Sequence, residues 1–353
     1  MKFRLCHLLL LFTFSASLHA VFGLNNEGVA LLSLLRRWTS VPYSLRSGWN
    51  TSDSTPCNWV GIECDSKNNA VSFNLSSYAI SGQLGPEIGH LRELEIIDLS
   101  SNDFSGNLPE ALGNCSALKC LDLSCNRFTG QIPDNFKHLQ FLSALVLNNN
   151  SLEGEIPESL FQIPGLQVVL LHFNYFNGSI PSNVCDMGEV ELLWLSGNRL
   201  SGTIPESIGN CSKLQVLSPD GNNLVGVLPE SLNNLKNLEY LNVNNNSLNG
   251  SIPSSFRNCK NLKGLSLSHN NFSGKIPPGL GNCSSLRLLE LSENRLSGKI
   301  PPELGKCKSL EILSLWKNQL EGRIPDELGM LSNLRYLKLS FNNLSGEIPH
   351  IKL

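Results

Sequence analysis

This 353-residue sequence lacks any long apolar run after its first residues. A membrane-spanning helix needs roughly 18 or more consecutive apolar residues, so we expect no transmembrane segment in the chain as given. Basic blocks and cationic stripes are missing too, and the formal net charge is −3. Because nucleic-acid-binding proteins carry a concentrated basic patch, the sequence disfavours nucleic acid as a partner.

Signatures of catalysis are also missing. The sequence contains none of the patterns H-E-x-x-H, G-x-S-x-G and G-x-x-x-x-G-K-[ST], which position metals, nucleophiles and phosphates in many enzymes. The later histidines lack the close spacing of a metal site, since they stand at His90, His138, His172, His269 and His350. We therefore expect a protein that is not an enzyme and that has no cofactor and no metal.

The chain begins with the features of a secretory leader. Lys2 and Arg4 precede the apolar run Leu8–Phe14, and small residues follow it. Cleavage after Gly23 or after Ala20 fits this layout. A signal anchor that stays in the membrane is the alternative, but the apolar core is too short to span a bilayer comfortably. We therefore predict residues 1–23 as a signal peptide and a secreted or cell-surface location.

Sequons for N-glycosylation are frequent, which agrees with passage through the secretory pathway. The candidate acceptors are Asn50, Asn74, Asn114, Asn149, Asn177, Asn210, Asn245, Asn249, Asn271, Asn282 and Asn343. Tight placement would leave some of them unmodified.

A repeat of 24 residues decides the fold. The pattern L-x-x-L-x-L-x-x-N-x-L/F-x-G-x-I/L-P, followed by a short helical or turn-like segment, recurs from Leu94 to Leu334, with a weaker copy at Ala70. Residues at positions 1, 4 and 6, such as Leu289 and Leu291, should point inward, because stacked coils bury a core that no single repeat could bury. The sequence thus predicts an α/β solenoid, a right-handed superhelix of about twelve coils over residues 70–353, with a parallel strand ladder on its concave face.

Position 9 of each coil is asparagine, from Asn102 to Asn342. Its amide can satisfy backbone groups where the chain leaves the strand, so we expect a ladder of asparagines. At position 6, Pro219 replaces the inward leucine of its coil and lacks the N–H that a strand ladder needs. We expect a local break in the sheet there.

The chain has 11 cysteines, and position 22 of the repeat accounts for several. Other coils have apolar residues there, for example Leu139 and Met187, so we interpret these cysteines as buried core residues. They are Cys115, Cys211, Cys259, Cys283 and Cys307. A metal column or a chain of disulfides is the alternative. Cys120 and Cys125 fall on exposed strand positions, too far apart to bridge each other comfortably.

Residues 24–69 should cover the N-terminal end of the stack, because an open solenoid end exposes its core. The segment Asn26–Thr39 has the pattern of an amphipathic helix, and the tryptophans after it add bulk. Cys57 and Cys64 should form a disulfide in an oxidising compartment, and a redox or metal pair is the alternative.

The cap and its S-G-x-I-P-type repeats resemble the plant extracellular leucine-rich-repeat class, found in receptor kinases, receptor-like proteins and inhibitors of wall-degrading enzymes. More narrowly, residues 57–65 (CNWVGIECD) and 81–89 (SGQLGPEIG) are similar to the start of the danger-peptide receptor kinases of the PEPR type. The resemblance implies recognition of a peptide or protein ligand in plant defence or developmental signalling, with a co-receptor kinase as a further partner. Such receptors continue into a transmembrane helix and a kinase, whereas this sequence stops uncapped at Leu353. We expect a fragment or an early end of the gene model.

Positions 2, 3, 5, 7 and 8 of each coil should face solvent on the concave side. Most are small or polar, and larger side chains are candidate anchors because interfaces favour Trp, Tyr and Arg. The predicted ligand-binding residues are Leu170, Phe173, Trp194, Asp220, Tyr240, Trp316, Lys317, Tyr336 and Lys338, with Phe341 on the same face. Scattered aromatic residues without a function are the alternative.

Charge changes along this face, from acidic residues such as Asp98 early to basic residues such as Lys338 late. An extended peptide with a basic stretch at the early coils and a carboxylate or acidic stretch at the late ones would suit it. The second function considered is a secreted inhibitor of microbial wall-degrading enzymes, similar to polygalacturonase-inhibiting proteins. Those inhibitors end in a cysteine-bearing cap, which is missing here, so the receptor function is favoured.

Overall fold

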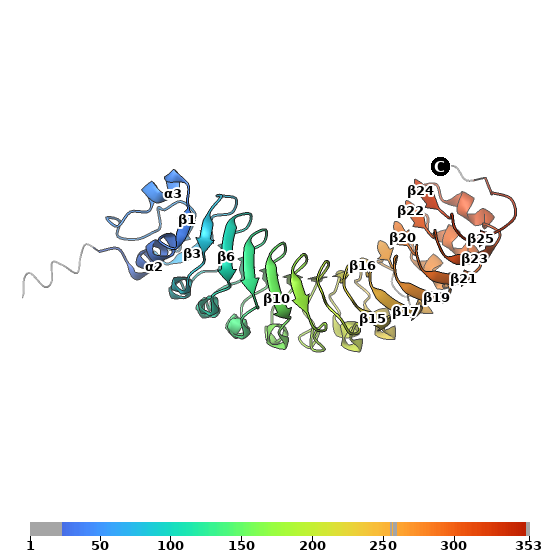
Figure 1. Ribbon diagram of the computed structural model, residues 1–353, viewed down its shortest axis with the longest axis horizontal. Helices are drawn as coiled ribbons and strands as arrows, with labels where there is room; N and C mark the ends of the chain where they lie inside the picture. The colour runs from blue at the N-terminus through green and yellow to red at the C-terminus, as the bar shows by residue number, and fades with distance from the viewer. Residues whose placement is uncertain (1–22, 255, 257–259, 351–353) are drawn as a thin grey trace, which may run out of the picture.

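The computed structural model describes residues 23–254, 256 and 260–350. They form one curved solenoid, whose coils follow each other in chain order from one end to the other (Figure 1). The predicted signal peptide, apart from its last residue, lies outside the described residues, and so does Cys259. Within the described ranges, no helix is long and apolar enough to cross a bilayer.

A sheet of 13 strands lines the inner side of the curve (Figure 1). Its first strand, β2, pairs antiparallel with β3, and the later pairs are parallel and one repeat apart, as in Leu265↔Leu289. Each of the predicted coils thus contributes one strand. The strands are β2 (Ile62–Cys64), β3 (Ala70–Asn74), β5 (Ile96–Asp98), β7 (Cys120–Asp122), β9 (Ala144–Val146), β11 (Val168–Leu170), β13 (Leu192–Trp194), β14 (Val216–Ser218), β16 (Tyr240–Asn242), β18 (Gly264–Ser266), β20 (Leu288–Glu290), β22 (Ile312–Ser314) and β24 (Tyr336–Lys338).

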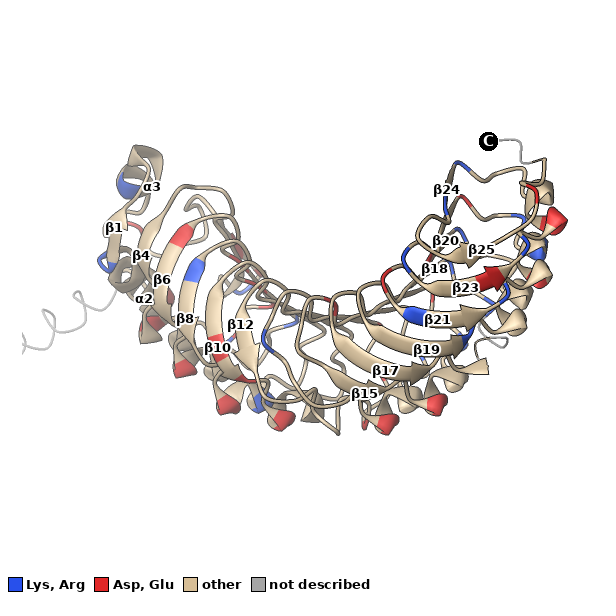
Figure 2. Ribbon diagram, turned by 45° about the vertical axis from the view of Figure 1, so that its right-hand side comes forward, with Lys and Arg blue, Asp and Glu red and all other residues tan. Residues whose placement is uncertain are grey.

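Two shorter sheets of six strands each follow one another along one flank of the coils (Figure 2). The first contains β1 (Trp38–Ser40), β4 (Ser81–Gln83), β6 (Asp103–Asn107), β8 (Arg127–Gly130), β10 (Ser151–Glu155) and β12 (Tyr175–Asn177). The second contains β15 (Val225–Val227), β17 (Ser247–Ser251), β19 (Asn271–Lys275), β21 (Arg295–Gly298), β23 (Gln319–Gly322) and β25 (Asn343–Leu344). Backbone bonds still cross between the two sheets, since Arg199 N donates to Phe176 O at 2.8 Å and Val225 N donates to Gly202 O at 2.8 Å.

Short 3₁₀-helices on the outer side return the chain to the next strand. Most follow a proline, whose fixed φ suits the start of a helical turn, and many have an acidic residue in the first turn, where the helix dipole favours it. They are η1 (Pro86–His90), η2 (Glu110–Asn114), η3 (Asp134–His138), η4 (Glu158–Gln162), η5 (Glu206–Asn210), η6 (Glu230–Asn234), η8 (Pro278–Asn282), η9 (Pro302–Lys306) and η10 (Asp326–Met330).

The core is a continuous column of apolar side chains between these layers. Inward leucines of position 6 are buried as the repeat predicts, with Leu291 and Leu315 both 0 % exposed. The asparagine ladder is confirmed as well. In one coil, Asn294 Oδ1 accepts from Phe272 N at 2.9 Å, and its Nδ2 donates to Leu267 O at 2.9 Å. The amide therefore ties neighbouring coils together through their backbones.

The N-terminal cap is built as expected, with one correction. Helix α2 spans Asn26–Leu35, short of the predicted end at Thr39, because Trp38–Ser40 forms strand β1 and pairs antiparallel with β4. A second helix, α3 (Tyr43–Gly48), follows. Cys57 and Cys64 form the predicted disulfide, with Cα atoms 5.4 Å apart.

The predicted break at Pro219 is wrong. Strand β14 pairs with both β13 and β16, so the main sheet is continuous through this coil. The missing N–H costs only one bond of the type that Leu195 N makes with Ser218 O at 2.9 Å. One lost hydrogen bond is too small an effect to interrupt a sheet held on both sides.

The prediction for position 22 holds in part. Cys115, Cys283 and Cys307 are buried, but Cys211 forms a disulfide with Cys185 of the preceding coil, with Cα atoms 4.9 Å apart. The outer segment of that preceding coil folds in turns instead of a 3₁₀-helix. These turns bury Cys185 and leave Met187, expected inside, 48 % exposed.

Candidate ligand-binding face

The concave sheet presents its positions 3, 5, 7 and 8 in rows that cross the coils. At position 8 the chain takes the left-handed conformation, with φ of 55° at both Phe173 and Lys317. This conformation strains residues other than glycine, and its recurrence shows that the turn out of each strand requires it. Side chains at position 8 therefore stand along one rim of the face.

The first group of predicted residues comes together on β11, β13 and the turns that follow β11 and β14; we name Phe173, Trp194 and Asp220 the early site. Leu170 is in register with Trp194 in the main sheet and is half-buried. The imidazole of His172 stacks on the Trp194 indole, with ring centroids 4.4 Å apart and an interplanar angle of 25°. Phe173 meets the same imidazole edge-on at 5.4 Å. Phe173 and Trp194 thus form a compact, exposed aromatic surface over the buried imidazole.

Asp220 belongs to the early site through a chain of hydrogen bonds. Trp194 Nε1 donates to Ser196 Oγ at 2.6 Å, and Ser196 Oγ donates to Asp220 Oδ1 at 2.5 Å. Ser218 Oγ also donates to Asp220 Oδ1, at 2.7 Å. Ser196 and Ser218 are buried, so the network holds both the indole edge and the carboxylate in place.

His172 is a residue that sequence reasoning passed over. Its side chain is 9 % exposed, and its Nδ1 has no hydrogen-bond partner in the described chain. Burial lowers the pKa of His172 below its usual 6.5, while the nearby Asp220 carboxylate acts in the opposite direction. The imidazole is therefore held neutral at neutral pH, as a flat support for Trp194.

Tyr240 lies alone between the two ends of the face and is 43 % exposed. Its ring rests against Gly264 on the neighbouring strand, where a Cβ atom would come within 2.8 Å of the ring. Any larger residue at 264 would push the ring away, so this glycine sets the position of the tyrosine.

The remaining predicted residues lie at the C-terminal end; we name Trp316, Lys317, Tyr336 and Lys338 the late site. Lys338 Nζ sits 3.9 Å from the Trp316 ring centroid, a cation–π contact, and Phe341 meets that ring edge-on at 6.1 Å. Trp316 is thus half-buried under its own neighbours, whereas Tyr336 is 49 % exposed. Trp316 is therefore less available to a ligand than the exposed Trp194, Tyr240 and Tyr336.

Pairing between coils neutralises part of the predicted charge gradient. Lys317 bonds Glu293 at 2.7 Å, and this contact holds the pKa of the Glu293 carboxyl below its usual range. Lys263 likewise pairs with Glu239 at 2.6 Å. Asp220 forms no ion pair with a lysine or arginine within the described residues.

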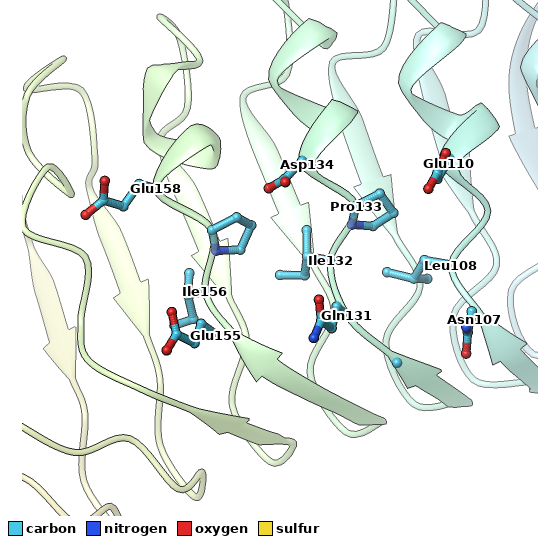
Figure 3. Close-up of a pocket in the computed structure, with 12 residues that line it drawn as sticks. Asn107, Leu108, Glu110, Gln131, Ile132, Pro133, Asp134, Glu155, Ile156 and Glu158 are labelled. Atoms are coloured by element: carbon cyan, nitrogen blue, oxygen red, sulfur yellow. The ribbon is translucent and has the colours of Figure 1, made fainter.

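Apart from the concave face, a pocket lies on the outer side of the solenoid, across the turns into η2, η3 and η4 (Figure 3). It measures about 780 Å³, and Glu110, Asp134 and Glu158 border it from successive coils. Each of these carboxylates opens a 3₁₀-helix, which explains its place. The described residues contain no group of His, Cys, Asp or Glu arranged to hold a metal ion.

The predicted glycan acceptors lie at the surface, and their modification stays a prediction. Most are exposed, namely Asn50, Asn74, Asn114, Asn149, Asn177, Asn210, Asn245, Asn249, Asn282 and Asn343, and Asn271 is half-buried.

Comparison with known proteins places this architecture in a class. A leucine rich repeat N-terminal domain model matches residues 24–65. Leucine rich repeat models match residues 116–176, 212–272 and 243–296, and also 93–115, 189–211, 309–331 and 333–351. The chain belongs to the leucine-rich-repeat family.

Within that family, plant receptor kinases are among the similar proteins. A receptor-like protein kinase from Ipomoea nil is 52 % identical over 95 residues, which are 27 % of this chain and 9 % of the relative. PEPR1 from Arabidopsis thaliana, a leucine-rich repeat receptor-like protein kinase, is 50 % identical over 92 residues, which are 25 % of this chain and 8 % of the relative. The matched segments are thus a small part of each relative.

Solved structures extend the likeness over nearly the whole chain. The structure of PEPR1 with AtPEP1 superposes with a TM-score of 0.83 at 48 % identity, covering 92 % of this chain and 50 % of that one. HAESA of Arabidopsis, solved with the peptide hormone IDA and the co-receptor SERK1, gives a TM-score of 0.65 at 30 % identity, covering 93 % of this chain and 67 % of that one. The fold is that of a plant leucine-rich-repeat receptor ectodomain.

Proposed function

We propose that this chain recognises a peptide outside the plasma membrane, as part of a receptor ectodomain in plant defence or developmental signalling. The ligand lies extended along the concave face from β11 to β24. Trp194, Tyr240 and Tyr336 are its main anchors, and Trp316 contributes under Lys338. A co-receptor kinase is the further partner that signalling through such a complex needs.

One observation carries this proposal: the similarity to a peptide-bound receptor structure over 92 % of the chain at 48 % identity. Three further features support it. The exposed rings belong to positions that do not build the core, the hydrogen bonds of the early site hold its indole and carboxylate in place, and no lysine or arginine among the described residues pairs with Asp220. Rigid aromatic residues with fixed polar neighbours are typical binding hot spots.

Isothermal titration of the secreted chain with AtPEP1 tests the proposal, with RGF2, the peptide of another similar receptor structure, as the specificity control. We expect saturable binding of AtPEP1 and at least about tenfold weaker binding of RGF2, a difference of about 1.4 kcal/mol. If the chain binds neither peptide and instead inhibits a microbial polygalacturonase, the inhibitor function replaces the receptor function.

A further inference from the structure

Asp220 is a carboxylate whose surroundings are built for a cation that the chain does not supply. Both hydrogen bonds from Ser196 and Ser218 arrive at Oδ1. Within the described residues nothing donates to Oδ2, and no lysine or arginine approaches the group. A half-buried carboxylate in this state retains both acceptor capacity and charge.

The Trp194 indole stands beside this carboxylate, separated from it by one hydroxyl group. Its N–H edge is fixed on Ser196 Oγ, which in turn bonds Asp220, and one of its faces is covered by His172. The indole is nevertheless 41 % exposed, so its solvent contact lies mainly on the opposite face. An open indole face next to an unpaired carboxylate is the arrangement that attracts a planar cation.

Glycine at position 8 leaves the rim beside Asp220 open. Position 8, which carries a side chain in the other coils, is Gly197 and Gly221 in the two coils that supply Trp194 and Asp220. Phe173 lies over Gly197, where a Cβ atom would come within 2.6 Å of its ring. Beside Gly221 only backbone of Gly197 comes near such a Cβ, at 3.4 Å, so the rim next to Asp220 is open.

We propose that the early site is a subsite for one guanidinium group, an arginine side chain of the ligand. The guanidinium stacks on the open face of Trp194 and donates hydrogen bonds to Asp220 Oδ2. Its planar shape favours it over an ammonium group, which cannot stack in this way. This assignment rests on the proposed function, because the arginine belongs to the peptide that lies along the face.

The test uses the whole chain labelled with 5-fluorotryptophan and a small probe, so that it does not depend on the peptide. The fluorine signal of Trp194 is assigned with Trp194→Phe and followed by NMR during titration with N-acetyl-arginine-methylamide. The neutral citrulline analogue has the same shape and serves as the reference probe. We expect saturation with the arginine probe at millimolar concentration and at least about tenfold weaker binding of the citrulline probe.

Asp220→Asn keeps the acceptor for Ser196 and Ser218 while removing the charge, and it should remove the difference between the two probes. Asp122→Asn is the matched control, because Asp122 is also a half-buried carboxylate on this face that accepts from a serine, Ser124 Oγ at 2.6 Å. Equal binding of both probes by the parent, or an unchanged preference in Asp220→Asn, would overturn the subsite. If the parent chain binds the arginine probe as expected but does not bind AtPEP1, the proposed function is refuted and the subsite is not.

Discussion

Replacing Asn222 by alanine tests how much the asparagine ladder contributes to stability. Asn222 is 8 % exposed, its Oδ1 accepts from Leu200 N at 2.9 Å, and its Nδ2 donates to Leu195 O and Pro219 O, both at 3.0 Å. The two carbonyls have second partners, because the amides of Asn198 and Asn246 reach them at 3.0 and 3.1 Å. Only the Leu200 N–H loses its sole partner.

The expected cost follows from this unequal loss. An orphaned buried N–H costs about 1–3 kcal/mol, and the weakened carbonyls add a smaller amount, so Asn222→Ala should lower the free energy of unfolding by about 3 kcal/mol. Chemical denaturation of the secreted chain measures it. Asn223→Ala is the matched control, because this neighbour is exposed and its side chain makes no hydrogen bond within the described residues; it should change stability by less than about 0.5 kcal/mol. Equal losses in both variants would refute the reasoning.

Three further predictions concern the face and the thiols. Trp194→Ala and Tyr240→Ala should each weaken AtPEP1 binding by about 2 kcal/mol or more, roughly thirtyfold, in calorimetric titration, and parent-like affinity in both would contradict the groove. In the native chain a thiol reagent should label the exposed Cys125 and leave Cys115 unmodified until unfolding, because burial raises the Cys115 pKa to about 12; early labelling of Cys115 would count against its place in the core. The folded-state pKa of His172 lies below its unfolded value of 6.5, so the unfolded chain takes up the proton first and stability should fall as the pH drops below about 6.5. His172→Gln, compared with the parent by unfolding at two pH values, should show a smaller loss of stability between them. An equal loss in both chains would show that His172 does not contribute to the pH dependence.

The repeat alone was enough to predict the solenoid, because nearly every coil places its leucines and its asparagine at the same positions. Leu291 is buried and Asn294 bonds its neighbouring coil for reasons that the 24-residue period already contains. The period failed where one coil departs from it. Cys211 stands at the core position 22, whereas Cys185 stands at position 20, and the repeat does not predict their disulfide because the pairing depends on turns that replace a 3₁₀-helix.

The sequence was enough to predict which residues lie on the candidate face, but not which contacts their side chains make. Counting along the repeat places both Trp194 and Trp316 on the concave face and does not distinguish them as ligand anchors. The structure separates them, because Trp194 keeps an open face while Lys338 covers the ring of Trp316. His172 and Ser196 support the early site from positions that look unremarkable in sequence, and only their geometry gives them a role.

The left-handed turn at position 8 has a consequence for how this surface can change. Its strain, of order 1–3 kcal/mol for a residue other than glycine, is imposed by the backbone and is largely the same for serine, phenylalanine or lysine. Substitutions among such residues therefore alter the rim of the groove at little cost to folding, as the present mixture of Asn149, Phe173, His269 and Lys317 illustrates. Position 8 is thus a natural place for new specificities to arise in evolution, and for an engineer to install them without redesigning the scaffold.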